Sequence, residues 1–343
     1  MKTKFYIKSI LCILTISIVL SLCACKKVEK RESREIYALD TVITLTAYGE
    51  NAEKALDAGV AEIRRLEALF SATKEGSDIW NINHSEGKGT VVSSDTVALL
   101  EKAVSAYEMT EGRFDITLYE VMKLWGFTTG EYKVPTEDEL LNALSSSGIE
   151  NLTINDLSVI LETGTSIDLG GIAKGYIGDR VAKVMKDEGC KCAVISLGGN
   201  IRTLGEKPTE EPFTIGIEHP QKSGYFATLE TDECSVVTSG AYERNFTIDG
   251  KFYHHIIDPE SGYPADSEFS SVTVTGKDGA MCDALSTAIF IKGADYAKKL
   301  YNESSDFSFV LLTKNEELLV SENLRGSLSL EKDYDDIKIT YFS

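Results

Sequence analysis

The sequence RNFTIDGKFYHHII, at residues 244–257, is the clearest indicator of local structure in this chain. Asp249-Gly250 stands between two runs rich in β-forming residues, and both residue types tolerate the positive φ that a two-residue type I′ turn requires. The pattern therefore predicts a β-hairpin, with strands at 244–248 and 251–257.

The patterns on both sides of this hairpin indicate the fold class. Runs of β-branched and aromatic residues predict strands at 36–48, 166–169, 193–197, 213–218, 225–229, 235–238, 271–275 and within 307–341. Apolar residues at helical spacing predict helices at 51–70, 94–111, 136–148, 172–188 and 280–291. Because these elements do not alternate strictly as βαβ units, we predict an α+β fold of mixed, largely antiparallel sheets flanked by helices.

Length and charge restrict the class of protein further. The 343 residues are 43% hydrophobic and contain six prolines, which indicates a globular chain without a proline-rich linker, folded as a single compact unit. The formal net charge of −19 disfavours nucleic-acid binding, because an acidic surface repels a phosphate backbone. An anionic ligand would need a local cluster of donors or a metal ion.

The N-terminal segment has the pattern of an export signal. Lys2, Lys4 and Lys8 precede an uncharged run at 9–24, which is shorter than the ~20 apolar residues of a spanning helix. Its end, LCAC, resembles the bacterial lipobox, which would make Cys25 the lipidated N-terminus. A plain signal peptide or an unprocessed anchor helix is the alternative. We expect a signal peptide at 1–24, a tether at 25–35 and a folded domain at 36–343, outside the cytoplasm.

The remaining cysteines do not form a recognisable framework. Four are too few for a disulfide scaffold in a domain of this size, and none has zinc-ligand spacing to a histidine. We interpret them as core thiols, with a disulfide among them left open: Cys190, Cys192, Cys234 and Cys282.

Two short patterns suit the binding of charged groups. In DLGGIAKG, at 168–175, two glycines precede a predicted helix with Lys174 in its first turn, and a helix N-terminus attracts anions. An ordinary turn with a solvated lysine has the same pattern. Asp283 and Thr287 lie four residues apart on a predicted helix, so both oxygens can bind one hard cation such as Mg²⁺. A first-turn Asp at the helix dipole and a Thr bonded to the preceding turn also fit.

The histidine pair of the hairpin offers a further candidate. Neighbouring side chains in a strand face opposite sides, so only one of His254 and His255 can face a site. A histidine bonded to a local carbonyl is the alternative interpretation.

Seven segments together resemble one family, the FAD:protein FMN transferases, or ApbE family. They occur in its order and spacing, within about 36–291: GRFDIT (112–117), LWGF (124–127), DLGGIAKGY (168–176), SLGGN (196–200), TSGAYER (238–244), DGKFYHHIIDPESGYP (249–264) and DALSTA (283–288). The lipoprotein start is also usual for this family.

The resemblance implies a single catalytic unit that transfers FMN from FAD to a threonine hydroxyl of a target flavoprotein. A phosphoester bond forms, AMP leaves, and Mg²⁺ is required. It implies metal binding by Asp283, Thr287 and the backbone carbonyl of Gly171. It implies FAD contacts from Leu39, Arg113, Phe114, Asp115, Asp168, Lys174 and Ile257. Leu39-Asp40-Thr41 stands where many members have Met-Gly-Thr. His255 is the better candidate of the pair for lining the site, and Asp283 is a candidate base for the acceptor hydroxyl.

Two other functions remain open on the sequence. With water as the acceptor, the same site would be an FAD pyrophosphatase that gives FMN and AMP. A lipid-anchored protein that binds flavin without turnover is the second alternative. The resemblance implies exported or membrane-anchored acceptors, such as flavin-carrying subunits of ion-pumping redox complexes. It places the protein on the extracytoplasmic face of the cell membrane.

Overall fold

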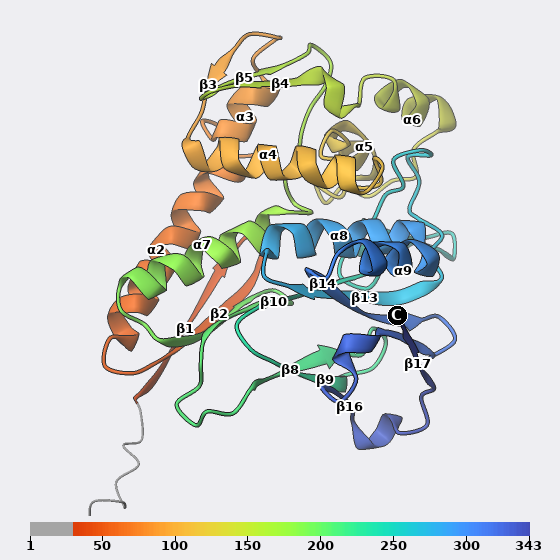
Figure 1. The fold of residues 1–343 in the computed structure, drawn as a ribbon. Coiled ribbons are helices and arrows are strands. Elements are labelled where there is room, and N and C mark those ends of the chain that lie inside the picture. The colour runs from red at the N-terminus through yellow and green to blue at the C-terminus, as the bar shows by residue number, and fades with distance from the viewer. Residues whose placement is uncertain (1–29) are drawn as a thin grey trace, which may run out of the picture.

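The structure is a computed structural model that describes residues 30–343. In this part of the chain the largest sheet has nine strands, in the order β1-β2-β6-β7-β10-β13-β14-β15-β17. Helices α2, α7 and α8 cover one face of it, and the small sheet β16-β9-β8 packs on the other (Figure 1). Helices α3 to α6 and the sheet β3-β5-β4 lie beyond α7 and α8, so these two helices form a middle layer.

The strands are β1 (Arg31–Ala38), β2 (Thr41–Tyr48), β3 (Thr90–Val91), β4 (Leu152–Asn155), β5 (Ser158–Leu161), β6 (Cys192–Leu197), β7 (Asn200–Gly205), β8 (Phe213–Glu218), β9 (Tyr225–Thr231), β10 (Ser235–Gly240), β11 (Asn245–Ile248), β12 (Lys251–His254), β13 (Phe269–Gly276), β14 (Phe307–Thr313), β15 (Leu318–Ser321), β16 (Leu328–Leu330) and β17 (Ile339–Phe342). All described pairings between them are antiparallel except that of β15 with β17. The predicted α+β class is confirmed.

The helices are α2 (Ala52–Phe70), α3 (Asp78–Asn83), α4 (Ser94–Met109), α5 (Tyr119–Trp125), α6 (Glu137–Leu144), α7 (Ala173–Asp187), α8 (Gly279–Lys292) and α9 (Ala294–Glu303). Short 3₁₀ turns lie at Ile149–Asn151, Glu322–Leu324 and Lys332–Tyr334. The five helices expected from the sequence are present. The capping box is also present, with Thr136 Oγ1 accepting from Glu139 N–H and the Glu139 carboxylate accepting from Thr136 N–H.

The N-terminal part of the fold differs from the expectation in two ways. The strand predicted at 36–48 is a hairpin, because Leu39 and Asp40 both adopt positive φ, 52° and 56°. Residues 31–35, which we predicted to belong to a tether, are part of β1, since Arg31 already pairs with Tyr48. The predicted signal peptide and Cys25 lie outside the described residues.

The predicted hairpin at Asp249-Gly250 is confirmed, with φ values of 52° and 75°. Its second strand ends at His254 rather than 257. An aromatic cluster holds the hairpin against α5, since Trp125 packs on Phe246 and Tyr253. The Trp125 Nε1–H also donates to the carbonyl of Gly262 over 2.8 Å, which fixes the loop that follows the hairpin.

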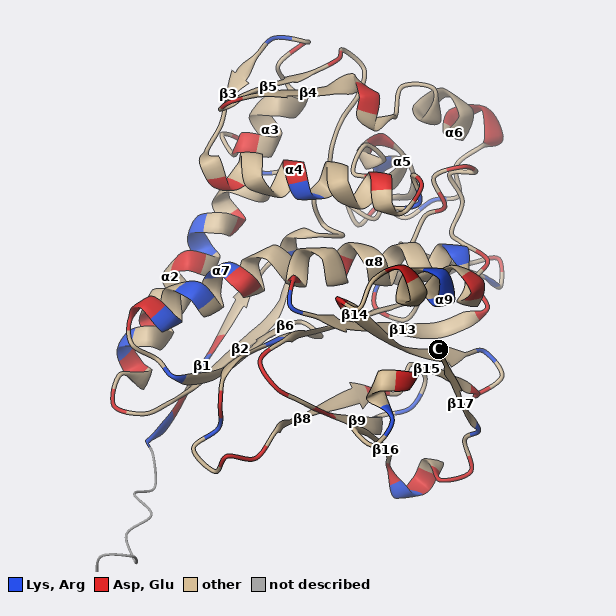
Figure 2. Ribbon diagram, viewed as in Figure 1, with Lys and Arg blue, Asp and Glu red and all other residues tan. Residues whose placement is uncertain are grey.

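Charged side chains join the middle layer to its neighbours. Acidic and basic residues are interleaved on α2 and α7 (Figure 2). Arg65 on α2 donates to Glu62 and Asp95, and Arg180 on α7 lies 3.3 Å from Asp95. Tyr176 O–H donates to the same carboxylate over 3.1 Å. Asp95 on α4 therefore links three helices and fixes the start of α7.

Three further observations complete the fold. The strand predicted at 166–169 is wrong: this extended segment has only an isolated bridge from Ser166 to Leu118. The four cysteines of the described part are buried, and none of them forms a disulfide within residues 30–343. No helix within residues 30–343 combines the length and apolar character needed to cross a membrane.

Candidate functional site

Helices α7 and α8 cross at two glycines, and two carboxylates bind the helices to each other. A Cβ atom on Gly175 would lie 2.0 Å from the carbonyl oxygen of Gly279, so only glycine allows this approach. Gly279 N–H donates to Asp179 Oδ2 over 2.7 Å, and Gly175 N–H donates to Asp283 Oδ2 over 3.0 Å. Each helix thus places a carboxylate at the first turn of the other, where the helix dipole favours negative charge.

The bond from Gly175 to Asp283 leaves the carbonyl oxygen of Gly171 free. In a continuous helix the Gly175 N–H would donate to this carbonyl, four residues earlier. Instead α7 begins at Ala173, and no residue in the described range donates a hydrogen bond to the Gly171 carbonyl. The Gly171 carbonyl therefore has no hydrogen-bond partner among the described residues, and it lies four residues before the N–H that donates to Asp283.

Thr287 lies one turn after Asp283 on α8 and is partly exposed. A threonine bonded to the preceding turn would donate to the Asp283 carbonyl. That carbonyl accepts from Ser286 Oγ over 2.7 Å instead. Within residues 30–343 the Thr287 hydroxyl has no hydrogen-bond partner, so it is free to bind a ligand.

Of the three predicted metal ligands, the Gly171 carbonyl and the Thr287 hydroxyl have no hydrogen-bond partner among the described residues, whereas Asp283 has one oxygen, Oδ2, bonded to Gly175 N–H. A carbonyl, a carboxylate and a hydroxyl are the oxygen ligands that Mg²⁺ prefers, with waters or phosphate oxygens in the remaining positions. The described residues contain no group of three or more His, Cys, Asp and Glu that could hold a metal. Burial raises the pKa of Asp283, an effect opposed by the Lys174 ammonium and the Gly175 N–H, and a bound cation would further favour the charged form.

Two cations face the same region without forming a salt bridge to a described residue. Lys174 is in the first turn of α7, and Arg244 precedes β11. Both charges lower the pKa of His255 and oppose the burial that raises the pKa of Glu243. Sequence reasoning missed Arg244 and Glu243, although the segment TSGAYER contains both. Two cations without partners suit an anionic ligand.

Asp168 leads into the glycine pair and turns the chain toward α7. Its Oδ1 accepts from Gly170 N–H over 2.8 Å, and its own N–H donates to the Ile116 carbonyl over 2.8 Å. Burial raises the pKa of Asp168, and Arg244 acts in the opposite direction. The structure therefore brings Asp168 close to Arg244.

His255 is neutral and has a defined tautomer. Its Nδ1 lies 3.2 Å from the Arg244 carbonyl, which can only accept, so Nδ1 carries the proton and Nε2 is left as an acceptor. Burial, the Arg244 charge and the Lys174 charge lower the pKa of His255 to about 3. His254 points the other way, toward Phe290 and the Ala265 carbonyl. The structure thus places His255, not His254, with the charged residues.

This low pKa makes a prediction for acid stability. His255 binds a proton less readily in the folded chain than in the unfolded one, so its protonation favours the unfolded state. The stability of the folded chain is therefore unaffected by His255 above pH ~6.5 and decreases as the pH falls toward 3. We expect His255→Gln to become more stable relative to the wild type by about 2 kcal/mol between pH 7 and pH 4.5. Thermal melts of both proteins across this range test it. Parallel curves would mean that His255 protonates freely in the fold.

The segment at 113–115 is held by three different contacts. Arg113 forms salt bridges with Asp258, at 3.1 Å, and with Glu260, in the loop after the hairpin. Phe114 is buried against Gly171, since a Cβ atom added to Gly171 would lie 3.0 Å from the Phe114 ring. Asp115 accepts from the N–H and hydroxyl of Thr117. Phe114 thus reaches the metal-ligand segment, whereas Arg113 is bonded to the loop after the hairpin and Asp115 is bonded to Thr117.

Leu39 and Ile257 contribute mainly apolar surface. Leu39 is in the positive-φ turn between β1 and β2, where its N–H donates to Glu67 over 2.7 Å. Ile257 is buried in the cluster around Trp125, just after His255. Leu39 packs against the main hydrophobic core and Ile257 belongs to the Trp125 cluster, so both side chains serve the packing of the described fold.

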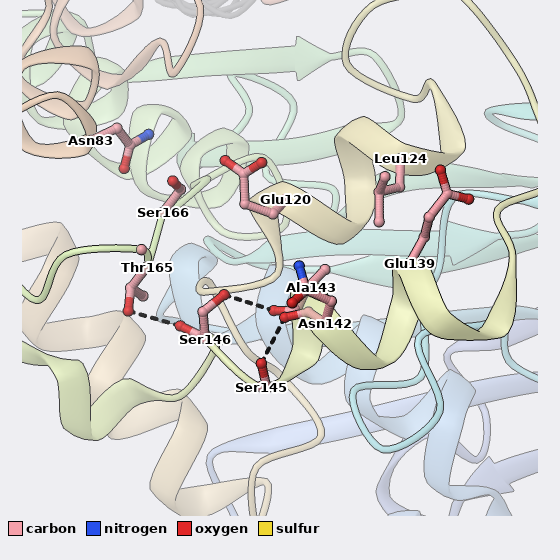
Figure 3. A pocket seen from close by; sticks show the side chains of 11 residues that line it. Asn83, Glu120, Leu124, Glu139, Asn142, Ala143, Ser145, Ser146, Thr165 and Ser166 are labelled. Atoms are coloured by element: carbon pink, nitrogen blue, oxygen red, sulfur yellow. Dashed lines mark hydrogen bonds between the residues drawn. The ribbon is translucent and has the colours of Figure 1, made fainter.

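A separate hollow of about 630 Å³ lies between α5, α6 and the loop before Asp168 (Figure 3). None of the predicted site residues lines it. Thr165 Oγ1 donates to the Ser146 carbonyl and Ser145 Oγ donates to the Asn142 carbonyl, so hydroxyls in its wall already have partners. A second hollow of about 700 Å³, which includes Asp278 and Met281, also lacks the predicted residues. We place the candidate site at the crossing of α7 and α8, where the chemical groups converge.

Comparison with known sequences gives one consistent result. The model of the ApbE family matches residues 39–311. An FAD:protein FMN transferase of Klebsiella pneumoniae is 34% identical over 285 residues, covering 81% of this chain and 88% of the relative. An FAD:protein FMN transferase of Treponema pallidum is 32% identical over 303 residues, covering 82% of this chain and 79% of the relative.

Solved structures show the same fold. The ApbE protein of Thermotoga maritima superposes with a TM-score of 0.82 at 30% identity, covering 87% of this chain and 99% of that protein. The apo form of the Pseudomonas stutzeri flavinyl transferase ApbE superposes with a TM-score of 0.73 at 26% identity, covering 82% and 91% of the two chains. The similarity thus extends over most of the described fold.

Proposed function

Because this chain belongs to the ApbE family, we propose that it is an FAD:protein FMN transferase, as its curated relatives are named. One observation supports this function most directly. Gly175 N–H of α7 donates to the Asp283 carboxylate of α8, while the Gly171 carbonyl and the Thr287 hydroxyl have no hydrogen-bond partner among the described residues. Such oxygen atoms are the ligands that Mg²⁺ prefers. A magnesium ion held there would neutralise negative charge on the pyrophosphate of FAD.

In the proposed reaction, a threonine hydroxyl of the acceptor protein attacks the phosphorus of the FMN half of FAD. An oxygen–phosphorus bond forms, the pyrophosphate bridge breaks, AMP leaves with the bridging oxygen, and the hydroxyl proton is released. The metal, when bound, withdraws charge from the phosphate oxygens. Asp283, Thr287 and the Gly171 carbonyl would hold it.

The other residues of the site bind and orient. Lys174 and Arg244 supply positive charge that no described carboxylate neutralises by a salt bridge, so they suit the phosphates. His255, neutral with Nε2 as an acceptor, suits a hydrogen-bond donor of the substrate better than a proton-transfer role, since a pKa of about 3 makes a weak base. Asp168, Arg113, Phe114, Asp115, Leu39 and Ile257 remain proposed FAD contacts.

Incubation with FAD, Mg²⁺ and a co-expressed acceptor flavoprotein tests the function. We expect a covalent fluorescent flavin band in a denaturing gel and an acceptor mass increased by one FMN. Mutation of the acceptor threonine to alanine is the control and should remove both signals. Release of FMN and AMP without a labelled acceptor would establish the pyrophosphatase instead. FAD that stays bound and intact with Mg²⁺ present would establish a flavin-binding protein.

The same proposal includes the location of the protein. We propose that Cys25 is lipidated and that the domain acts at the extracytoplasmic face of the cell membrane, on exported or membrane-anchored flavoproteins such as redox-pump subunits. The lipobox-like sequence before Cys25 supports it. Membrane fractionation of the wild type and Cys25→Ala tests this, since only the wild type should remain with the membrane.

A further inference from the structure

Asn200 is buried at the site without a hydrogen-bond partner. It opens β7, directly after the turn at Gly198-Gly199, which both have positive φ. The residue as a whole is only 3% exposed. Within the described residues, neither the amide oxygen nor the amide nitrogen has a hydrogen-bond partner. A buried unpaired amide costs free energy, so an interaction that the isolated chain lacks is expected to compensate for it.

The position of this amide identifies the missing interaction. Asn200 lies against the Asp283 carboxylate and opposes the burial that raises its pKa, as a hydrogen-bond donor does. The contact nevertheless falls outside hydrogen-bond geometry, because both amide atoms remain unpaired. Asp283 Oδ2 is already bonded to Gly175 N–H. Asn200 therefore lies beside the carboxylate that we propose as a metal ligand, one of whose oxygens is already bonded.

We propose that Asn200 is a further residue of the metal site, which positions Asp283 and hydrogen-bonds the water shell of the divalent cation. A side-chain amide offers an acceptor oxygen and two N–H donors, so it can serve a carboxylate and a metal-bound water at the same time. Mg²⁺ keeps several waters when the protein supplies few ligands, and such waters need partners. The inference rests on the metal site of the proposed function.

The test compares metal affinity with the stability of the metal-free protein. Asn200→Leu replaces the amide by an apolar group of similar size. Replacement of an outer partner of a metal site typically lowers affinity 10–100-fold, so we expect the Kd for Mn²⁺, measured by electron paramagnetic resonance without FAD, to rise at least tenfold. We expect the metal-free Tm to be unchanged or higher, because no hydrogen bond is lost.

Thr203→Val is the matched control on the same strand. Thr203 is fully buried, and its hydroxyl is bonded to the carbonyls of Asp232 and Cys234. This variant should lower the Tm and leave the Kd for Mn²⁺ unchanged. Ser271→Ala removes another unpaired buried hydroxyl, on β13, and should change neither quantity appreciably.

A second variant keeps the inference testable if Asn200→Leu fails to fold. Asn200→Asp retains an oxygen but places a second negative charge beside Asp283. We expect a lower metal-free Tm and a larger increase in Tm on addition of Mn²⁺ than in the wild type. Equal Mn²⁺-induced increases in the two proteins would overturn the inference.

The remaining outcomes separate this inference from the proposed function. A folded Asn200→Leu that binds Mn²⁺ with wild-type affinity refutes the role of Asn200 and leaves FMN transfer untouched. A wild type that binds Mn²⁺ through Asp283 and Asn200 but labels no acceptor refutes the transferase and leaves the metal site standing. A wild type that binds no Mn²⁺ overturns the inference.

Discussion

Asp283→Asn is expected to lose FMN transfer by about 10³-fold or more while the fold is retained. The variant removes the only carboxylate among the three proposed metal ligands, and the charge stabilisation that a metal supplies is worth several kcal/mol, with ~4 kcal/mol equal to 10³-fold. The amide oxygen of the new residue can still accept from Gly175 N–H, so the crossing of α7 and α8 keeps its hydrogen bond.

The measurement is the rate of acceptor labelling at saturating FAD and Mg²⁺, together with the Tm. Asp283→Ala should be equally inactive but less stable, because it leaves the buried Gly175 N–H unpaired at a cost of about 1–3 kcal/mol. Asp278→Asn is the control on the same helix: Asp278 caps α8 by accepting from Met281 N–H, and Asn caps equally well. Full labelling by Asp283→Asn or Asp283→Ala in metal-containing buffer would remove the metal assignment.

Gly175→Ala is expected to be the most destabilising single methyl addition in α7. The added Cβ would lie 2.0 Å from the Gly279 carbonyl oxygen, which is backbone and cannot rotate away. The helices must separate, at a cost of about 3 kcal/mol, or a decrease in Tm of about 6–10 °C. Separation also moves Gly175 N–H away from Asp283, so labelling of the acceptor should fall with stability.

Gly178 on the same helix provides a control, because the same substitution is expected to raise the stability there instead of lowering it. A Cβ at this position would lie 3.4 Å from the Cβ of Arg202 and 3.5 Å from Leu197 Cδ1, which is ordinary contact. Gly178→Ala should therefore stabilise the protein by about 0.5–1 kcal/mol through helix propensity alone. Thermal melts of the two variants decide the point: equal Tm values would contradict the close approach of α7 and α8.

Several site features could be predicted because they depend on neighbours along the chain. The spacing of Asp283 and Thr287 places both on one face of any helix that forms there. The turn at Asp249-Gly250 and the exclusion of one histidine from the site follow from strand geometry. The segment TSGAYER is one of the motifs that resemble the family, but nothing local distinguishes Arg244 as a cation without a salt-bridge partner.

Two predictions, a continuous strand at 36–48 and a strand at 166–169, are wrong because distant residues impose a conformation that the local sequence disfavours. Leu39 is a poor residue for positive φ, yet it forms a turn with Asp40 because β1 pairs with β2 over its full length and Glu67 accepts the Leu39 N–H. The segment at 166–169 has strand-forming residues, but its N–H and carbonyl groups are bonded to Asn83 and Ile116 instead of a neighbouring strand.

The amino-acid sequence by itself determined the fold class, the helix that carries Asp283 and Thr287, and the resemblance to a flavin transferase family. Only the tertiary structure decided that Gly175, 108 residues earlier, donates to Asp283, and that this bond frees the Gly171 carbonyl. It likewise decided that Asn200 is buried beside Asp283 without a partner. The physical reason is that hydrogen bonds between distant residues depend on how helices pack, and packing is set by the glycines at which α7 and α8 cross.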